Sequence, residues 1–200
     1  MNHNQRAALA NPNLEFAAST FLGQPVGPNQ MLFVLNKVEN AIAPVKILFE
    51  AKGEAEYSRL DYGDTILVVL PPDTSNITFS PESFVGYNML EKVIGIEDST
   101  ALSAGMFTEC TSLVFERLNQ TIIPEACFAV CTALTRVEIP NALTVEVNAF
   151  AGCTNLTVIL NDDVQSVAVN SFANIDNLIY HGSLPGAPWG ATKWNGVPQN

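Results

Sequence analysis

The heptapeptide FAVCTAL, Phe128 to Leu134, places a phenylalanine, a cysteine and a leucine at intervals of three residues. Taken alone, its thiol could be a nucleophile, a metal ligand or one half of a disulfide. The same pattern occurs again at Phe107 (FTECTSL) and at Phe150 (FAGCTNL). The role of Cys131 therefore depends on whether this pattern is a structural repeat.

Two further copies extend the pattern in both directions. FVGYNML begins at Phe84 and has Tyr87 in the cysteine position, while FANIDNL begins at Phe172 and has Ile175 there. The five phenylalanines are separated by 23, 21, 22 and 22 residues. A nearly constant period of this length indicates a repeat architecture, because one such unit cannot bury its apolar face alone but stacked units can.

Each copy continues into a short segment with the composition of a strand. The segments LTRVEI and LTVIL, for example, are rich in Val, Ile and Leu and alternate partly in polarity. Turn residues follow, as at Pro140-Asn141 and at 161–163, and a second apolar alternation leads to the next phenylalanine. We therefore predict a mainly β protein whose second part is a leucine-rich-repeat-type solenoid of about five coils of 21–23 residues.

In such a solenoid, equivalent residues of successive coils form ladders along its axis. A shared ladder position explains Cys110, Cys131 and Cys153 together as packing residues, whereas catalysis or metal binding would require convergence with histidines or acids. Free cysteine is also among the most buried residue types. Disulfides between coils remain an alternative, because four cysteines permit bridges. The predicted ladders contain Phe84, Phe107, Phe128, Phe150 and Phe172, then Cys110, Cys131 and Cys153, then Leu90, Leu113, Leu134, Leu156 and Leu178.

The order of these features resembles the BspA-like leucine-rich repeats of bacterial surface proteins. Residues 131–156 carry the closest match, in which the Cys-x-x-Leu pattern is followed by a Val/Ile pair, a proline and a Val-rich arm. The tail segment GAPWGA resembles the end of such arrays. The resemblance covers roughly residues 81–195, with departures at Tyr87, at Ile175 and in the arm over residues 138–150, which lacks the usual Ile-Gly pair. It implies a parallel-stranded solenoid used for adhesion and display, without catalytic residues.

The N-terminal part of the chain lacks this period. Closely spaced strand-like runs without helical patterns suggest a small antiparallel sheet or sandwich over residues 31–80. Residues 1–30 contain NPN and GQPVGP and few charges, which predicts an extended arm that lies on another surface. The strand-like runs are residues 31–38, 45–51 and 64–72, with 76–80 as a fourth candidate.

The predicted organisation is thus an arm over 1–30, a small β domain over 31–80 and a solenoid over 81–195. The solenoid needs a C-terminal cap, because a terminal coil exposes an apolar face. Trp189 and Trp194 are the candidates for that cap.

The charge balance of the chain disfavours several classes of partner. Twenty acids against nine bases give a net charge of -11, which opposes nucleic acid and anionic lipid. Residues 1–80 carry eight acids and five bases, whereas residues 81–200 carry twelve and four. No run approaches the roughly 18 apolar residues of a membrane span, and the N-terminus lacks the apolar core of a signal peptide.

Other reactive groups form no recognisable catalytic pattern. His3 and His181 have no partners by pattern, and Cys127 occupies a position that varies between coils. The Asp162-Asp163 pair is typical of a turn, with calcium coordination as the alternative. Phosphate-loop, dinucleotide and zinc motifs are missing from the sequence. We therefore predict no catalytic, cofactor-binding or metal-binding residues.

The function expected from these features is structural and non-enzymatic: a protein that displays its repeats on an outer surface. The missing leader, the initial Met1 and an N-terminal arm that is expected to be ordered favour a virion component, such as a capsid decoration or fibre-like protein. A bacterial cell-surface adhesin is the alternative, and a carbohydrate-binding accessory module, relying on Trp189 and Trp194, is a second one. The expected partners are other proteins, bound through the arm and the β domain in a homo-oligomer or a capsid or surface scaffold. A host protein or glycan is a further candidate ligand on the repeat face.

Overall fold

The structure is a computed structural model in which the described residues form strands and turns, without a helix. Within those residues no helix is therefore long and apolar enough to cross a lipid bilayer. The arm predicted over residues 1–30 lies outside the described part, except for Gln30 itself. The described residues are 30–35, 46–50, 55–57, 65–70, 77–79, 81–98 and 102–199.

The first sheet is built around an antiparallel pairing of three strands. Strand β1 (Gln30–Leu35) lies between β2 (Lys46–Glu50) and β4 (Thr65–Val69) and is antiparallel to both. The side chains of β4 are all buried. The antiparallel arrangement predicted for this part of the chain is therefore present.

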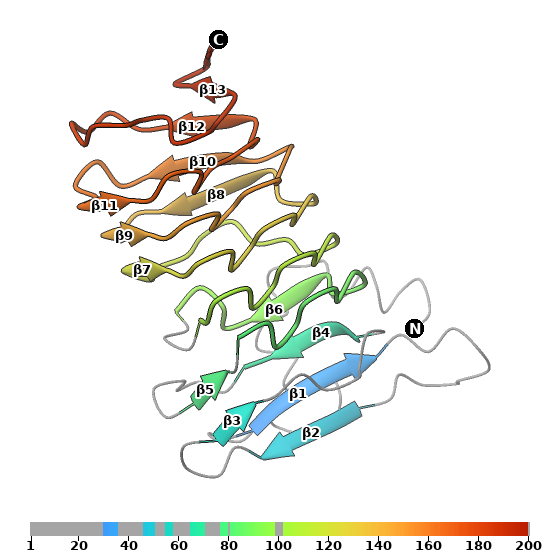
Figure 1. The fold of residues 1–200 in the computed structure, drawn as a ribbon. Helices are drawn as coiled ribbons and strands as arrows, with labels where there is room; N and C mark the ends of the chain where they lie inside the picture. Colours follow the sequence, from blue (N-terminus) through green and yellow to red (C-terminus); the bar gives the residue numbers. More distant parts are fainter. Residues whose placement is uncertain are drawn as a thin grey trace.

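This sheet does not end at β4 but passes into the repeats. Strand β6 (Lys92–Ile94), in the first coil, pairs in parallel with β4, so the sheet order is β2-β1-β4-β6 (Figure 1). Strands β3 (Ala55–Tyr57) and β5 (Ile77–Phe79) form a second, parallel pair. Within the small antiparallel sheet or sandwich predicted over residues 31–80, the β3–β5 pair runs parallel, because strand spacing alone does not reveal strand direction.

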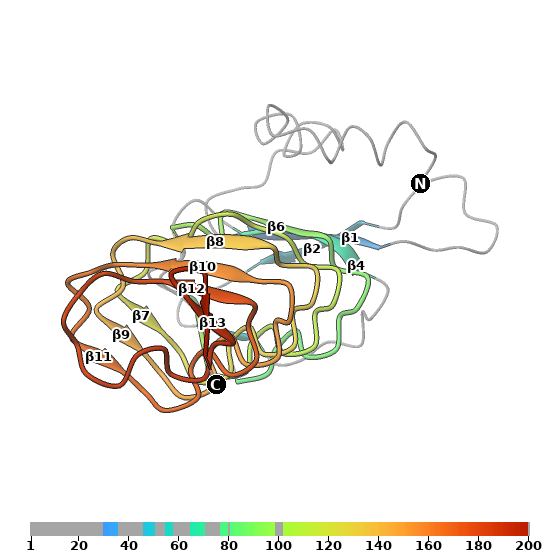
Figure 2. The same cartoon turned by 90° about the horizontal axis from the view of Figure 1, so that it is seen from above.

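The later coils stack in parallel and place strands on two sides of the solenoid (Figure 2). One side ends in an antiparallel strand, β14, which contains Pro198. Because proline has no N–H to donate, it closes this edge to further pairing. The first side consists of β8 (Arg136–Ile139), β10 (Thr157–Leu160), β12 (Asn177–Ile179), β13 (Lys193–Trp194) and β14 (Val197–Pro198). The second side consists of β7 (Ile122–Ile123), β9 (Thr144–Val145) and β11 (Ser166–Val167).

A third side is formed by the Phe-x-x-Cys segments, which are tight turns rather than strands. In the first three coils, three backbone N–H groups donate to backbone carbonyls of the next coil. They belong to the phenylalanine, to the residue two before it and to the residue two after it; Phe107 N–H, for example, donates to Cys127 O at 2.8 Å. In all five coils these two flanking residues have positive φ. They are Glu82, Gly86, Gly105, Glu109, Ala126, Val130, Asn148, Gly152, Asn170 and Asn174.

Six of these ten flanking residues are Gly or Asn, the residues that adopt the left-handed region at least cost. Val130 is the exception with the highest cost, because a β-branched side chain at φ 61° crowds its own backbone. Replacing Val130 with asparagine, as at Asn174, is therefore expected to raise the free energy of unfolding by about 1 kcal/mol. Denaturant unfolding measures the difference.

The matched control for this substitution is Val114→Asn. Val114 is 50% exposed and Val130 is 39% exposed, but Val114 has no positive φ. We expect Val114→Asn to give no stabilisation. An equal gain at both positions would show that the backbone conformation of Val130 is not the cause.

The core contains the phenylalanine, cysteine-position and leucine ladders, together with other buried side chains such as Val137 and Ile139. The five phenylalanine rings are 0% exposed and stack with centroids 5.1, 5.6, 5.4 and 6.1 Å apart, at interplanar angles of 6–16°. Tyr87 and Ile175, which replace cysteine, are buried in the same ladder. The five leucines of the third ladder are 0–1% exposed.

The two ends of the phenylalanine stack are covered by other aromatic rings. Phe79 lies against Phe84 at 5.8 Å, and Trp189 lies against Phe172 at 6.4 Å, both with tilted rings. Trp189 also contacts Tyr180, at 5.3 Å. Because tilted rings do not extend a parallel stack, they end it at both sides.

Candidate interaction surface

The three ladder cysteines are held by hydrogen bonds to the preceding coils. Cys110 Sγ donates to Phe84 O at 3.2 Å, and Cys131 donates in the same way to Phe107 O at 3.1 Å. Cys153 continues the series with a bond of 3.1 Å to Phe128 O. All four cysteines of the chain, Cys127 included, are buried and unbridged. The ladder thiols therefore form hydrogen bonds to backbone carbonyls.

Burial also keeps these thiols in their neutral form. It raises the pKa of Cys110 and of Cys153 to about 12, and it raises the pKa of Cys131 well above its ordinary value. Because the thiolate is the nucleophile and the metal ligand, a buried neutral thiol is inert. These positions are therefore unsuited to the chemistry that FAVCTAL suggests when it is read alone.

The raised thiol pKa values predict that the protein loses stability at high pH. In the unfolded chain a thiol ionises near its ordinary pKa of 9.0, whereas folded Cys110 and Cys153 stay protonated up to about pH 12. Between these values the unfolded state binds fewer protons, so the free energy of unfolding falls by about 1.4 kcal/mol per pH unit for each thiol. Denaturant unfolding under reducing conditions at pH 8–11 measures this fall.

The control for this prediction is the double variant Cys110→Ala/Cys153→Ala. This variant lacks the two thiols but keeps the other titrating groups of the chain. Its free energy of unfolding should therefore fall less steeply with pH than that of the wild-type protein. Parallel declines in the two proteins would contradict the assignment of buried, neutral thiols.

The remaining sequence candidates do not converge on a reactive centre. The N–H of exposed His181 donates to Asp162 Oδ1 at 2.8 Å, and the N–H of Asp163 donates to Asn161 Oδ1 at 3.1 Å, as in an Asx turn. His3 lies outside the described residues. In the part of the chain that the structure describes, no group of three His, Cys, Asp or Glu side chains is placed to hold a metal ion.

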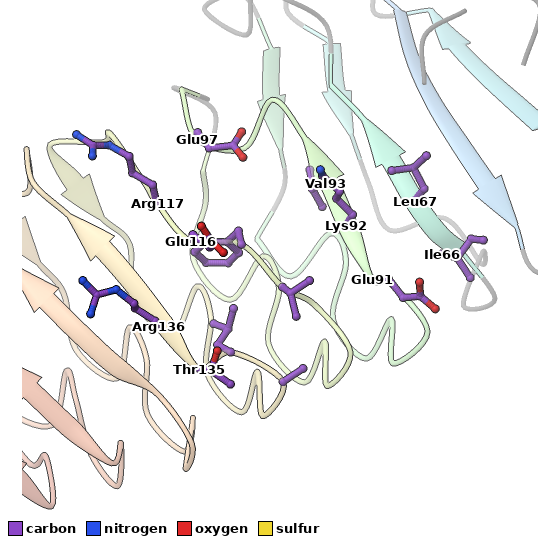
Figure 3. Close-up of a pocket in the computed structure, with 14 residues that line it drawn as sticks. Ile66, Leu67, Glu91, Lys92, Val93, Glu97, Glu116, Arg117, Thr135 and Arg136 are labelled. Atoms are coloured by element: carbon purple, nitrogen blue, oxygen red, sulfur yellow. The ribbon is translucent and has the colours of Figure 1, made fainter. Parts of the chain in front are cut away.

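A groove of about 580 Å³ lies on the side of the solenoid that carries β4, β6 and β8 (Figure 3). It lies where the second coil, residues 113–118, forms no strand between β6 and β8. Backbone bonds from this coil to the first one are present on either side of the gap, from Val114 N–H to Glu91 O at 3.1 Å and from Asn119 N–H to Glu97 O at 2.8 Å. The sheet is therefore interrupted at this coil.

The sequence of the second coil explains the interruption. Glu116 occupies the position at which the next coil buries Val137, and a carboxylate cannot take that place in the core without a large desolvation cost. Glu116 is exposed instead, and Phe115 packs its half-buried ring against Phe128 at 5.0 Å. Arg117 still forms a bridge to Glu138 of β8. One acid at a core position thus opens the groove.

One rim of the groove carries a pair of arginines that share a carboxylate. Arg117 Nη1 lies 3.5 Å from Glu138 Oε2, and Arg136 Nη2 lies 3.0 Å from Glu138 Oε1. Arg117 Nε also donates to Asn119 Oδ1 at 2.9 Å. Figure 3 shows both arginines on this rim and Glu91 on the opposite, β6 side. Lys92 of β6 lies on the same side as Glu91, so that side of the groove carries both signs of charge.

Three of the four bases in residues 81–199 line this groove, although the same region carries twelve acids. They are Lys92, Arg117 and Arg136; the fourth base, Lys193, pairs with Asp176 at 2.7 Å elsewhere. Glu91, Glu97 and Glu116 complete the charged lining. Basic side chains are thus concentrated at one place on an acidic solenoid.

A second hollow, of about 260 Å³, continues the same side of the solenoid. It shares Glu138 with the basic rim and adds the apolar side chains of Ile159 and Ile179 from β10 and β12. The outward face of these parallel strands, which we call the sheet face, therefore runs from the charged groove to a hollow that combines isoleucines with Asp162 and His181. The sequence analysis did not predict this surface. Its signal was Glu116, an acid at a position where other coils have an apolar residue such as Val137.

Comparison with known families identifies the repeats. A family model described as BspA type leucine rich repeat region matches residues 67–179 in six copies, which is more than half of the chain. The match begins within β4, before the first phenylalanine copy at Phe84. No curated protein and no solved structure matches the chain.

Proposed function

Because the chain belongs to the BspA-type leucine-rich repeat family, we propose that it is a non-enzymatic structural and interaction protein that displays its sheet face on an outer surface. Repeats of this type form interaction modules and are typical of surface-associated proteins. Stacked units of this kind build extended binding surfaces from successive repeats.

The observation that carries this proposal is a contrast between the inside and the outside of the coils. Inward positions repeat the same chemistry, with phenylalanine and leucine in every one of the five coils. Outward positions of the sheet face change from coil to coil, as in Arg136, Thr157 and Asn177, which lie in register on β8, β10 and β12. A constant core with a varied face supports partner recognition rather than one repeated reaction.

The N-terminal strands support a role in attachment. We propose that the β domain over residues 31–80, together with the arm, anchors the chain to a scaffold or to further copies of itself. Its β4 pairs directly with β6, so a load on the repeats would pass through backbone hydrogen bonds into this sheet.

Carbohydrate binding through the tryptophans is not favoured by the structure. Trp189 is 6% exposed and packs against Phe172 and Tyr180. Trp194 is half-buried, and its Nε1 donates to Tyr180 O at 3.0 Å. The two rings therefore cover the end of the solenoid and do not form an open platform on which a sugar could stack.

Antibody labelling in electron microscopy tests the display function and separates its two settings. Label on the outside of purified virus particles from the native source would support a virion component. Label on the outside of intact bacterial cells would support an adhesin. Label confined to the cell interior, with neither particles nor cell surfaces marked, would overturn the proposal.

A further inference from the structure

We propose that the groove between β6 and β8 binds an acidic peptide segment of a partner protein, in which apolar residues flank an Asp or Glu. This inference rests on the proposed interaction function and names the ligand class of one part of the sheet face. Its volume of about 580 Å³ lies within the range of roughly 300–1,000 Å³ that ligand pockets occupy.

The basic rim provides the recognition of a carboxylate. The side chains of Arg117 and Arg136 are 52% and 57% exposed, so a ligand can reach them. Each guanidinium has five N–H donors, and the contacts to Glu138 and Asn119 use only some of them. Glu138 contacts both guanidinium groups and restrains them before a ligand arrives, which lowers the entropic cost of binding. The remaining donors suit a second, incoming carboxylate.

The charge of the rest of the solenoid directs such a ligand to this place. Twelve acids against four bases in residues 81–200 repel an anionic segment from most of the surface. In the groove, Lys92, Arg117 and Arg136 offset the three acids of the lining, Glu91, Glu97 and Glu116, so this repulsion is weaker there than elsewhere on the solenoid. Glu91 lies on the β6 side in Figure 3. The exposed arginines on the opposite rim are therefore the contacts that we assign to the ligand's acid.

The apolar part of the groove selects a peptide over an acidic glycan. Val114 is 50% exposed and Phe115 is half-buried, whereas Val93 and Leu134, which also line the groove, are only 1% exposed. The hydroxyl groups of a sugar would lose water at these side chains without gaining hydrogen bonds, which is unfavourable. Apolar side chains next to the acid would instead gain buried area at the same place.

Selection from a random heptapeptide display library against the full chain tests this proposal. We expect enriched peptides to contain Asp or Glu between apolar residues, and to bind more weakly as salt is raised, because salt screens exposed charges. The variant Arg117→Glu/Arg136→Glu should bind the selected peptides at least about tenfold more weakly, since like charges would then meet. The matched control Lys193→Glu, which changes the fourth base outside the groove, should bind them within about twofold of the wild-type protein.

Thermal unfolding shows whether the double variant is folded, and Arg117→Gln/Arg136→Gln provides a milder version of the same test. The proposal is overturned if no peptides, or only basic peptides, are enriched. It is also overturned if the two arginine double variants bind the peptides as tightly as the wild-type protein, or if Lys193→Glu weakens binding as much as they do. Binding of a polyuronate instead of peptides, or groove-dependent dimerisation in sedimentation experiments, would assign the groove to a glycan or to a second copy. Surface labelling in microscopy does not depend on the groove, so the display function can survive a failure of the peptide selection.

Discussion

Replacing Phe128 with alanine is expected to lower the free energy of unfolding by about 3–5 kcal/mol. The ring is fully buried and stacks between Phe107 at 5.6 Å and Phe150 at 5.4 Å, with Phe115 at 5.0 Å on a third side. These neighbours are fixed by the coils on both sides, so they cannot collapse into the space that the ring leaves. Guanidinium unfolding followed by circular dichroism measures the loss.

The control for Phe128→Ala is Cys131→Ala in the same coil. It removes a smaller side chain and one hydrogen bond, to Phe107 O at 3.1 Å, and should cost less stability. A loss of less than about 1 kcal/mol for Phe128→Ala would be typical of a surface position and would contradict a continuous aromatic core.

Replacing Gly190 with alanine is expected to destabilise the protein by about 2–5 kcal/mol, the sum of a backbone cost and a packing cost. Gly190 has a φ of +97°, which adds roughly 1–2 kcal/mol for a residue with a side chain. A Cβ atom at this position would lie 2.8 Å from Ala173 Cα and 3.1 Å from Ala173 N, and forced overpacking costs typically about 1–3 kcal/mol. Because these atoms belong to the backbone, the segment around Gly190, which closes the solenoid, would have to shift away from the last repeat. The same unfolding experiment measures this loss.

Gly196 provides the matched control, since it has a φ of +81° but no neighbouring atom within 4 Å of the place that a Cβ atom would take. Gly196→Ala should therefore carry only the backbone cost, about 1–2 kcal/mol. Similar losses at Gly190 and Gly196 would show that the close approach of the closing coil to Ala173 does not matter for stability.

The repeat architecture could be predicted from the sequence because its signal is redundant. Five phenylalanines at a nearly fixed spacing define the coil, and the substitutions Tyr87 and Ile175 show that the cysteine position requires bulk rather than a thiol. The structure places these side chains in one buried ladder. Because the same packing arrangement occurs in five coils, equivalent positions can be compared with one another within a single sequence.

The features of the fold that could not be predicted from the sequence depend on single residues or on strand direction. The groove follows from one unusual residue, Glu116, whose effect becomes visible only when β6 and β8 are seen on either side of it. The parallel pairing of β4 with β6 depends on how the chain enters the first coil, which no local pattern encodes. The left-handed positions, by contrast, had a signal in the Gly and Asn residues at fixed offsets from each phenylalanine.

FAVCTAL and its copies build a packed solenoid core and do not form a reactive site. Alkylation of the folded protein with iodoacetamide at pH 8, followed by intact mass measurement, tests this claim most directly. The buried, unbridged state of all four cysteines predicts no labelled thiol in the native protein and four labelled thiols in denaturant. Rapid native labelling of Cys131, or a denatured and unreduced protein with fewer than four reactive thiols, would contradict it.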